Sequence, residues 1–117
     1  MEKYNVEELE LLAIQIGCII RLSRLENKLS QEELALLVGT NSTRIGRIER
    51  AEHISGWDKL LLICQQLKID FTGLFSLKTK RELLIIIEDS FNLEERLNQD
   101  KKDYYSFLKK IVSKKYS

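Results

Sequence analysis

The chain has 117 residues, of which 44% are hydrophobic, and it carries a formal net charge of +1 at pH 7. This length suits one modest core with an appendage, and the hydrophobic fraction is too high for a disordered chain. A net charge so close to zero neither favours nor excludes a nucleic-acid partner. Proline is absent and only 5 residues are glycine, so the composition predicts an all-α protein.

The sequence also indicates where in the cell the protein is located. No apolar run approaches the roughly 18 residues that a membrane span requires, and the first residues do not resemble a signal peptide. Two cysteines, Cys18 and Cys64, lie among apolar residues of predicted helices. This placement favours buried free thiols over a disulfide. We therefore expect a cytoplasmic protein that does not associate with a membrane.

The first predicted helix covers about residues 6–27. Asn5 and Glu8 have the spacing of a capping box, in which each residue satisfies a backbone N–H of the first turn. Apolar residues then recur three and four positions apart as far as Ile20, which is the spacing of a helix with one buried face.

A second and a third helix follow closely. Ser30 and Glu33 form another capping box, and the helix they begin ends at Gly39. The third helix begins near Asn41 or Ser42 and runs through Arg50. In the second helix, the spacing predicts that three apolar side chains face inward, namely Leu34, Leu37 and Val38.

The second half of the chain predicts four more helical segments, at residues 57–67, 71–75, 82–98 and 101–114. Ser55 and Asp58 have capping-box spacing at the first of these, and Asp100 is the expected cap of the last. We expect Trp57 and Phe71 to lie in the core or at an interface. A hinge near residues 78–81 would divide the chain into a domain at 6–77 and a C-terminal extension at 78–117.

The stretch from Ser30 to Arg50 places small and apolar residues where two short crossing helices need them. Ala35 has the small side chain that a steep crossing requires, and Gly39 can begin a tight turn in the left-handed conformation. Ile45 and Ile48 form the face with which the third helix packs. These features in register predict a helix-turn-helix, whose second helix enters the major groove of DNA.

The outward face of the third helix would then contact DNA. On a helical wheel of about 100° per residue, Thr43, Gly46, Arg47 and Arg50 point outward. An exposed glycine inside a helix costs about 1 kcal/mol against alanine, which a close approach to the DNA would justify. Arg47 can donate two hydrogen bonds to guanine. The predicted DNA-binding residues are Gln31, Asn41, Ser42, Thr43, Arg44, Arg47 and Arg50.

Three of these residues have a contact that follows from their position. Ser42 and Thr43 would reach base edges or phosphates, and Gln31 would hold a phosphate at the start of the second helix. From charge alone, the arginines could instead form a solvated surface, and the helical pair could serve protein contacts only. The helix-turn-helix pattern favours DNA binding over both of these alternatives.

A longer pattern supports this interpretation, with matching residues at Ile20, Arg21, Arg24, Leu29, Ser30, Gln31, Leu34, Ala35, Val38, Gly39, Ser42, Ile45, Ile48, Glu49, Trp57, Leu60, Ile63, Cys64, Leu67, Ile69, Leu74 and Phe75. This pattern, over about residues 16–76, resembles the Cro and repressor class (XRE family) of phage-type helix-turn-helix regulators. The resemblance implies a five-helix lambda-repressor-like domain, followed here by a two-helix extension. It also implies that Gln31 contacts the DNA backbone and that Arg44 lies near the phosphates.

The resemblance further implies a structural ion pair between Arg24 and Glu49, which would tie the first helix to the end of the third. The chain departs from the family in the loop before the fourth helix. Ala51 stands where the family often has glycine, and Ser55 stands where it often has proline. These departures affect the expected geometry of that loop and leave the motif intact.

The residue pattern does not predict an enzyme. There is no paired nucleophile and base, no glycine-rich phosphate loop and no cluster of metal ligands. His53 is the only histidine, and the neighbouring carboxylates Glu32 and Glu33 diverge by about 100° on a helix. We therefore expect no catalytic residues, no cofactor, no bound metal and no small-molecule substrate.

The C-terminal extension predicts an antiparallel helical pair, with apolar residues from Leu83 to Leu97 and from Tyr104 to Val112. Such a pair cannot bury its apolar faces alone, so it must pack on the first helix or on a second subunit. We favour a homodimer, with a dimer that exchanges residues 83–87 as strands as the alternative.

The partner expected from these arguments is double-stranded DNA. The function expected is that of a dimeric transcriptional regulator, a repressor at an inverted-repeat operator. The alternative is an antitoxin-type DNA-binding protein whose C-terminal tail binds a protein partner. A ligand-sensing regulator is a further possibility, but a tail of about 40 residues leaves little room for an effector pocket.

Overall fold

The computed structural model describes residues 3–53 and 55–116, and this part of the chain is all-α and contains no strand. The elements are α1 (Val6–Glu26), α2 (Gln31–Val38), α3 (Ser42–Glu49), α4 (Trp57–Leu67), the 3₁₀ helix η1 (Thr72–Phe75), α5 (Lys80–Leu93) and α6 (Gln99–Lys115). The predicted fold class is confirmed. None of the described helices has the length and hydropathy that crossing a membrane requires.

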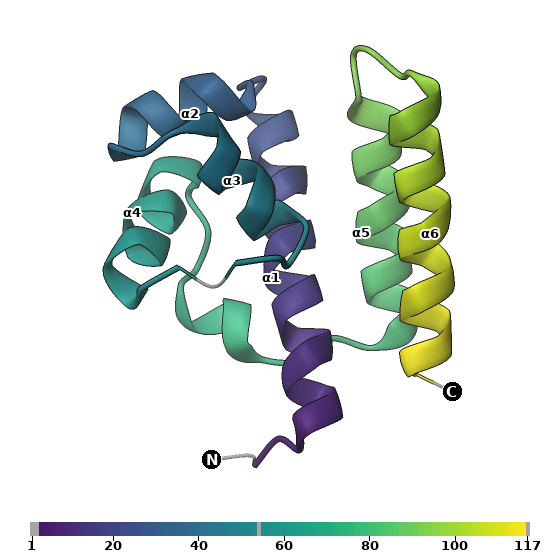
Figure 1. Ribbon diagram of the computed structural model, residues 1–117. Coiled ribbons are helices and arrows are strands. Elements are labelled where there is room, and N and C mark those ends of the chain that lie inside the picture. The colour runs from purple at the N-terminus through teal and green to yellow at the C-terminus, as the bar shows by residue number, and fades with distance from the viewer. Residues whose placement is uncertain (1–2, 54, 117) are drawn as a thin grey trace.

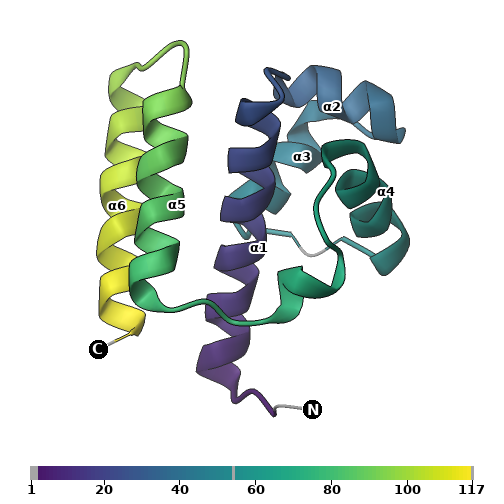
Figure 2. The ribbon, with the colours of Figure 1, turned by 180° about the vertical axis from the view of Figure 1, so that it is seen from behind.

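α1 is the central element of the fold (Figures 1 and 2). The helices α2, α3 and α4 gather on one side of it, and α5 and α6 form an antiparallel hairpin along the other side. Ile20 of α1 joins a core with Leu34, Ile45 and Ile63. Cys18, also in α1, joins a second core between α1 and the hairpin, whose other buried members are Leu83, Ile87, Tyr105, Leu108 and Val112. One helix therefore forms a wall of both cores.

Local capping explains where most of the helices begin. The predicted capping boxes of α1 and α2 are confirmed, and a third one, formed by Thr79 and Glu82, begins α5. Gly39 ends α2 in the left-handed conformation, at φ 73° and ψ 41°. The turn that the sequence predicts between α2 and α3 is therefore built as expected.

Two predicted caps are wrong. Ser55 does not cap α4, because the residue directly before the helix is Gly56, which makes no side-chain cap hydrogen bond. Asp100 lies inside the first turn of α6, and Asn98 is the cap instead, with its Oδ1 accepting a hydrogen bond from the Lys101 N–H at 2.9 Å. α6 consequently begins at residue 99 rather than 101, and α5 ends at residue 93 rather than 98.

One predicted core residue is also wrong. Leu37 is 53% exposed, because α3 and α4 cover only the arc of α2 that carries Leu34, Ala35 and Val38. Trp57 is 73% exposed at the start of α4, which excludes the core, and its place at an interface stays a prediction. Both predicted free thiols are confirmed as buried, and burial raises the pKa of Cys18 and of Cys64 to about 11.

The segment between η1 and α5, which the sequence marks as a hinge, is held by side chains from both ends of the chain. The buried Gln15 donates from Nε2 to the carbonyl of Ser76 at 2.9 Å and accepts from the Lys78 N–H at 2.7 Å. The hydroxyl of Tyr4 donates to the carbonyl of Phe75 at 2.9 Å, and that of Tyr116 donates to the carbonyl of Lys78. The division of the chain at residues 77–78 stays a prediction.

The hairpin buries its inner face on α1 of the same chain, which is one of the two solutions that the sequence leaves open. Residues 83–87 lie inside α5 and are helical. The alternative prediction, a dimer that exchanges these residues as strands, is therefore wrong. The residues satisfy their backbone hydrogen bonds within the helix and leave no strand edge to exchange.

Candidate nucleic-acid interface

The helix α3 separates its residues into a buried and an exposed face. Ile45 and Ile48 are buried in the core at 0% and 3% exposure. Ser42, Thr43, Arg44 and Arg47 are exposed. Asn41 caps the helix with its Oδ1, which accepts from the Arg44 N–H at 2.9 Å. Four of the predicted site residues therefore share one solvent-facing surface, and a fifth fixes where the helix begins.

Gly46 lies elsewhere than the helical wheel predicts. It is buried, and a Cβ atom there would lie 3.0 Å from Nη1 of Arg50 and 3.5 Å from Oε1 of Gln31. The two long side chains cover the glycine, an arrangement that a wheel of α3 alone cannot show. The glycine is therefore explained by the packing of Gln31 and Arg50 over the helix, and the prediction of an exposed glycine is wrong.

Gln31 and Arg50 both have partners within the protein. Gln31 donates from Nε2 to Oε1 of Glu49 at 3.1 Å. Arg50 pairs with Glu52, with Nε 2.9 Å from Oε2, and these two side chains are 41% and 54% exposed. An exposed ion pair of this kind contributes at most about 1 kcal/mol, so a phosphate can compete with Glu52 for Arg50.

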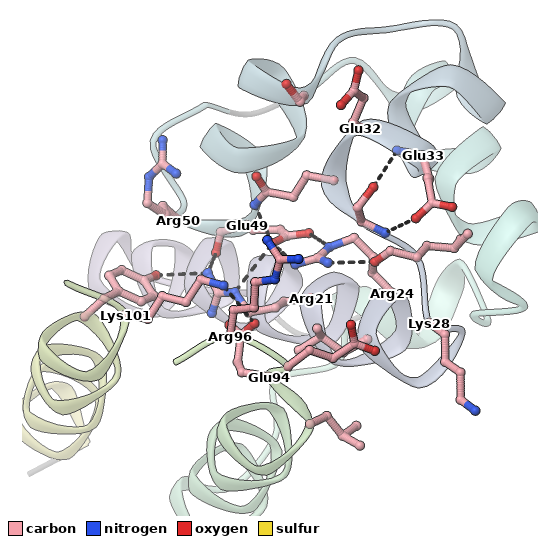
Figure 3. A pocket seen from close by; sticks show the side chains of 18 of the residues that line it. Arg21, Arg24, Lys28, Glu32, Glu33, Glu49, Arg50, Glu94, Arg96 and Lys101 are labelled. Atoms are coloured by element: carbon pink, nitrogen blue, oxygen red, sulfur yellow. Dashed lines mark hydrogen bonds and ion pairs between the residues drawn. The ribbon is translucent and has the colours of Figure 1, made fainter. Parts of the chain in front are cut away.

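The side chain of Glu49, the last residue of α3, is fully buried against α1. Arg24 binds its carboxylate with two hydrogen bonds, from Nε to Oε2 at 2.6 Å and from Nη2 to Oε1 at 3.1 Å. Nη1 of Arg24 also donates to the carbonyl of Leu29, in the turn before α2, at 2.8 Å. The same arginine thus joins α1, the start of α2 and the end of α3 (Figure 3).

A second arginine reaches the end of α3, and the sequence gives it no individual role. Arg21 is buried, its Nη2 donates to the carbonyl of Glu49 at 2.8 Å, and its Nε lies 3.5 Å from Oε1 of the same residue. One turn earlier in α1, Gly17 contacts the same peptide, because a Cβ atom there would lie 2.5 Å from the carbonyl oxygen of Glu49. Gly17, Arg21 and Arg24 are three or four positions apart and so lie on one face of α1, but the residue that they share as a contact, Glu49, lies in α3.

A family model described as helix-turn-helix matches residues 20–74, which span the end of α1 through most of η1. Residues 20–74 form a helix-turn-helix domain of the Cro and repressor class. This family is a DNA-binding family and not an enzyme family, as the sequence predicts. No curated protein and no solved structure matches the chain.

The loop that follows α3 in the helix-turn-helix domain contains the alanine that departs from the family. Ala51 has a φ of 59°, in the left-handed region. Its N–H donates to the carbonyl of Ile48 at 3.1 Å, and the next N–H, of Glu52, donates to the carbonyl of Arg47 at 2.8 Å. The chain therefore ends α3 in a left-handed turn, with a residue that is strained there.

Replacing Ala51 by glycine is expected to raise the free energy of unfolding by about 0.5–1 kcal/mol. Relief of the left-handed strain on alanine, about 1–2 kcal/mol, exceeds the extra backbone entropy that glycine loses on folding, about 0.5–1 kcal/mol. Urea unfolding followed by circular dichroism measures the change. Ala13→Gly, inside α1, is the matched control and should destabilise. If Ala51→Gly lowers the free energy of unfolding, Ala51 is not strained by its left-handed conformation.

A cleft of about 840 Å³ opens between the start of α2 in the helix-turn-helix domain and the tip of the α5–α6 hairpin (Figure 3). Basic and acidic side chains alternate along it, and Lys101 lies 3.5 Å from Glu94 across the tip. The cleft adjoins the exposed face of α3, because Ser42 and Arg50 also line it. Among the described residues, no group of histidine, cysteine and carboxylate side chains is placed to hold a metal ion.

Proposed function

We propose that this protein is a transcriptional repressor that binds an inverted-repeat operator as a homodimer, with α3 in the major groove. The observation that supports this most directly is the exposed face of α3, where Ser42, Thr43, Arg44 and Arg47 lie on a helix that is anchored by a buried ion pair at its C-terminal end. Such a helix presents donors to base edges without having to order itself on binding.

The site residues divide by the DNA group that each would contact. Arg47 would read a guanine, and Ser42 and Thr43 would reach neighbouring base edges. Arg44, Arg50 and Asn41 would contact phosphates, Asn41 through the amide nitrogen that its capping bond does not use. Because the Gln31 side chain already binds Glu49, its phosphate contact would come from the amide hydrogen left over and from the backbone N–H groups at the start of α2.

The size of the domain supports the proposal of a homodimer, since one recognition helix buries too little DNA for tight specific binding. The inner face of the hairpin is already used by α1. Contact between subunits would therefore involve apolar side chains on the outside of the hairpin, such as Ile85 and Phe107, which are 50% and 55% exposed.

The test compares Arg47→Ala with Arg44→Ala, which is the same change on the same helix. Fluorescence anisotropy would measure binding to DNA from upstream of the gene and to a scrambled duplex, over a series of salt concentrations. Wild type should prefer the upstream DNA by about 10³ or more. Arg47→Ala should lose about 1–3 kcal/mol of that preference, while Arg44→Ala should weaken binding to both duplexes equally and reduce the salt slope by about 1.

Hydroxyl-radical footprinting of the bound DNA tests the dimer. Two protected regions about one helical turn apart are expected, and a single protected region would rule out the paired half-sites. If binding is equally weak to both duplexes and insensitive to Arg47, the repressor function is excluded. The helix-turn-helix would then act as a scaffold for a protein partner, as in the antitoxin-type alternative.

A further inference from the structure

We infer that the C-terminal hairpin positions the recognition helix through Tyr104, which holds Arg21 against the C-terminal end of α3. The inference rests on the proposed function, because it takes α3 as the helix that reads DNA. It assigns Tyr104 a role as a positioning residue that acts through Arg21, and it makes the extension part of the DNA-binding machinery.

The first step is the contact between Arg21 and α3. The last carbonyls of a helix have no partner within the helix, and they lie at the negative end of its dipole. The guanidinium of Arg21 donates to the carbonyl of Glu49 at 2.8 Å, so it supplies both a donor and a positive charge at that end. Arginine side chains stabilise helix ends in this way. Here the arginine comes from α1 and fixes the end of α3 in space.

The second step is the contact between Arg21 and α6. Nη2 of Arg21 also donates to the hydroxyl of Tyr104 at 3.2 Å, and its Cζ lies 4.9 Å from the centre of the Tyr104 ring and 5.7 Å from that of Tyr105. A cation held near aromatic rings and shielded from water is attracted to them. The two tyrosines therefore restrict the position of the guanidinium.

The third step is the rigidity of the tyrosine pair. The ring of Tyr105 packs edge-on against Phe91 of α5 at 5.5 Å and against the Tyr104 ring at 6.0 Å. Its hydroxyl donates to Glu94 at 2.8 Å. Tyr104 is thus backed by the core of the hairpin. A continuous path of contacts runs from α5 and α6, through Arg21, to the peptide that ends the recognition helix.

The test uses Tyr104→Phe and Tyr104→Ala, with Tyr116→Phe and Tyr116→Ala as matched controls. Tyr116 is also a half-buried tyrosine beside the hairpin core, but its hydroxyl binds Lys78, close to the start of α5. At a temperature where circular dichroism shows every variant folded, Tyr104→Phe should lower affinity for the upstream DNA about threefold and Tyr104→Ala about tenfold, from the lost hydrogen bond and ring contact. The Tyr116 variants should bind like wild type.

A double-mutant cycle shows whether Tyr104 acts through Arg21. In the background of Arg21→Met, Tyr104→Ala should have little further effect on DNA affinity, because the intermediate contact is already lost. Independent, additive losses would mean that Tyr104 acts on the DNA directly, and would overturn the inference. If Arg21→Met does not fold, the comparison of the Tyr104 and Tyr116 variants decides alone.

Hydrogen exchange in the free protein gives a readout that needs no DNA. Tyr104→Ala should speed amide exchange over residues 45–50 more than over α2, and Tyr116→Ala should not. Equal exchange in α3 of the Tyr104 and Tyr116 variants, or wild-type DNA affinity in a folded Tyr104→Ala, would overturn the inference. A different result would separate the two proposals. If Arg47→Ala leaves DNA binding unchanged while Tyr104→Ala speeds amide exchange in α3, the proposed function is overturned, but the positioning of α3 by Tyr104 still holds.

Discussion

Replacing Glu49 by glutamine is expected to lower the free energy of unfolding by about 3 kcal/mol, which lies in the range found when one partner of a buried ion pair is removed. The Glu49 side chain is fully buried, and those of Arg21 and Arg24 are 6% and 8% exposed. Glutamine keeps the volume of the side chain but leaves two buried positive charges without a counter-charge. Its amide nitrogen would also place a donor against the donors of Arg24.

Urea unfolding followed by circular dichroism measures this effect, and Glu52→Gln provides the matched control. Glu52 makes the same kind of ion pair with Arg50, but on the surface, where its loss should cost less than about 1 kcal/mol. A Glu49→Gln variant as stable as Glu52→Gln would show that the pair at the end of α3 adds nothing beyond a surface contact.

Substitution of Gly17 is the second change with a large expected effect. A Cβ atom at Gly17 would lie 2.5 Å from the carbonyl oxygen of Glu49 and 2.7 Å from that of Ile48. Both contacts are with backbone, so no side chain can rotate away, and α1 and α3 must separate. Gly17→Ala should destabilise by about 2 kcal/mol and Gly17→Val by more than about 3 kcal/mol, since overpacking costs about 1–3 kcal/mol or more and alanine recovers about 1 kcal/mol of helix propensity.

Gly56→Ala is the control for the size of the added group, because its Cβ would meet only the mobile carboxylate of Asp58. Thermal unfolding should show only a small fall in melting temperature for this control, which replaces glycine by the less favourable alanine at the N-cap of α4, and a clear fall for Gly17→Ala. DNA affinity of Gly17→Ala, measured where it is folded, should also fall, because the end of α3 is displaced. A neutral Gly17→Ala would mean that the two helices do not approach as closely as the structure shows.

Much of the fold was predictable because its signals are local. The capping boxes at Asn5 and at Ser30 involve residues three positions apart, and Gly39 marks the turn by itself. The spacing of Ile45 and Ile48 gave the buried face of α3 correctly. Asn98 was missed as a cap because Asp100, two residues later, is an equally good capping residue type, and the sequence alone does not choose between them.

The predicted DNA-binding residues of α3 could be chosen from the sequence because helical periodicity determines which side chains face the solvent. Their contacts with DNA stay predictions. What the sequence could not provide are the contacts between distant segments, such as those of Gln31 with Glu49 and of Arg21 with Tyr104, which are 18 and 83 residues apart. Gly46 was misplaced for this reason, since the side chains that cover it belong to Gln31 and Arg50.

The position of α1 between two cores has a consequence for how the chain acquires its structure during synthesis. Ile20 can be covered once α2, α3 and α4 have left the ribosome, because its neighbours lie at residues 34–67. Cys18, on the other side of the same helix, is covered by residues as late as Val112. α1 therefore exposes an apolar side until α5 and α6 have been made, and during that interval this side is open to contact with other chains.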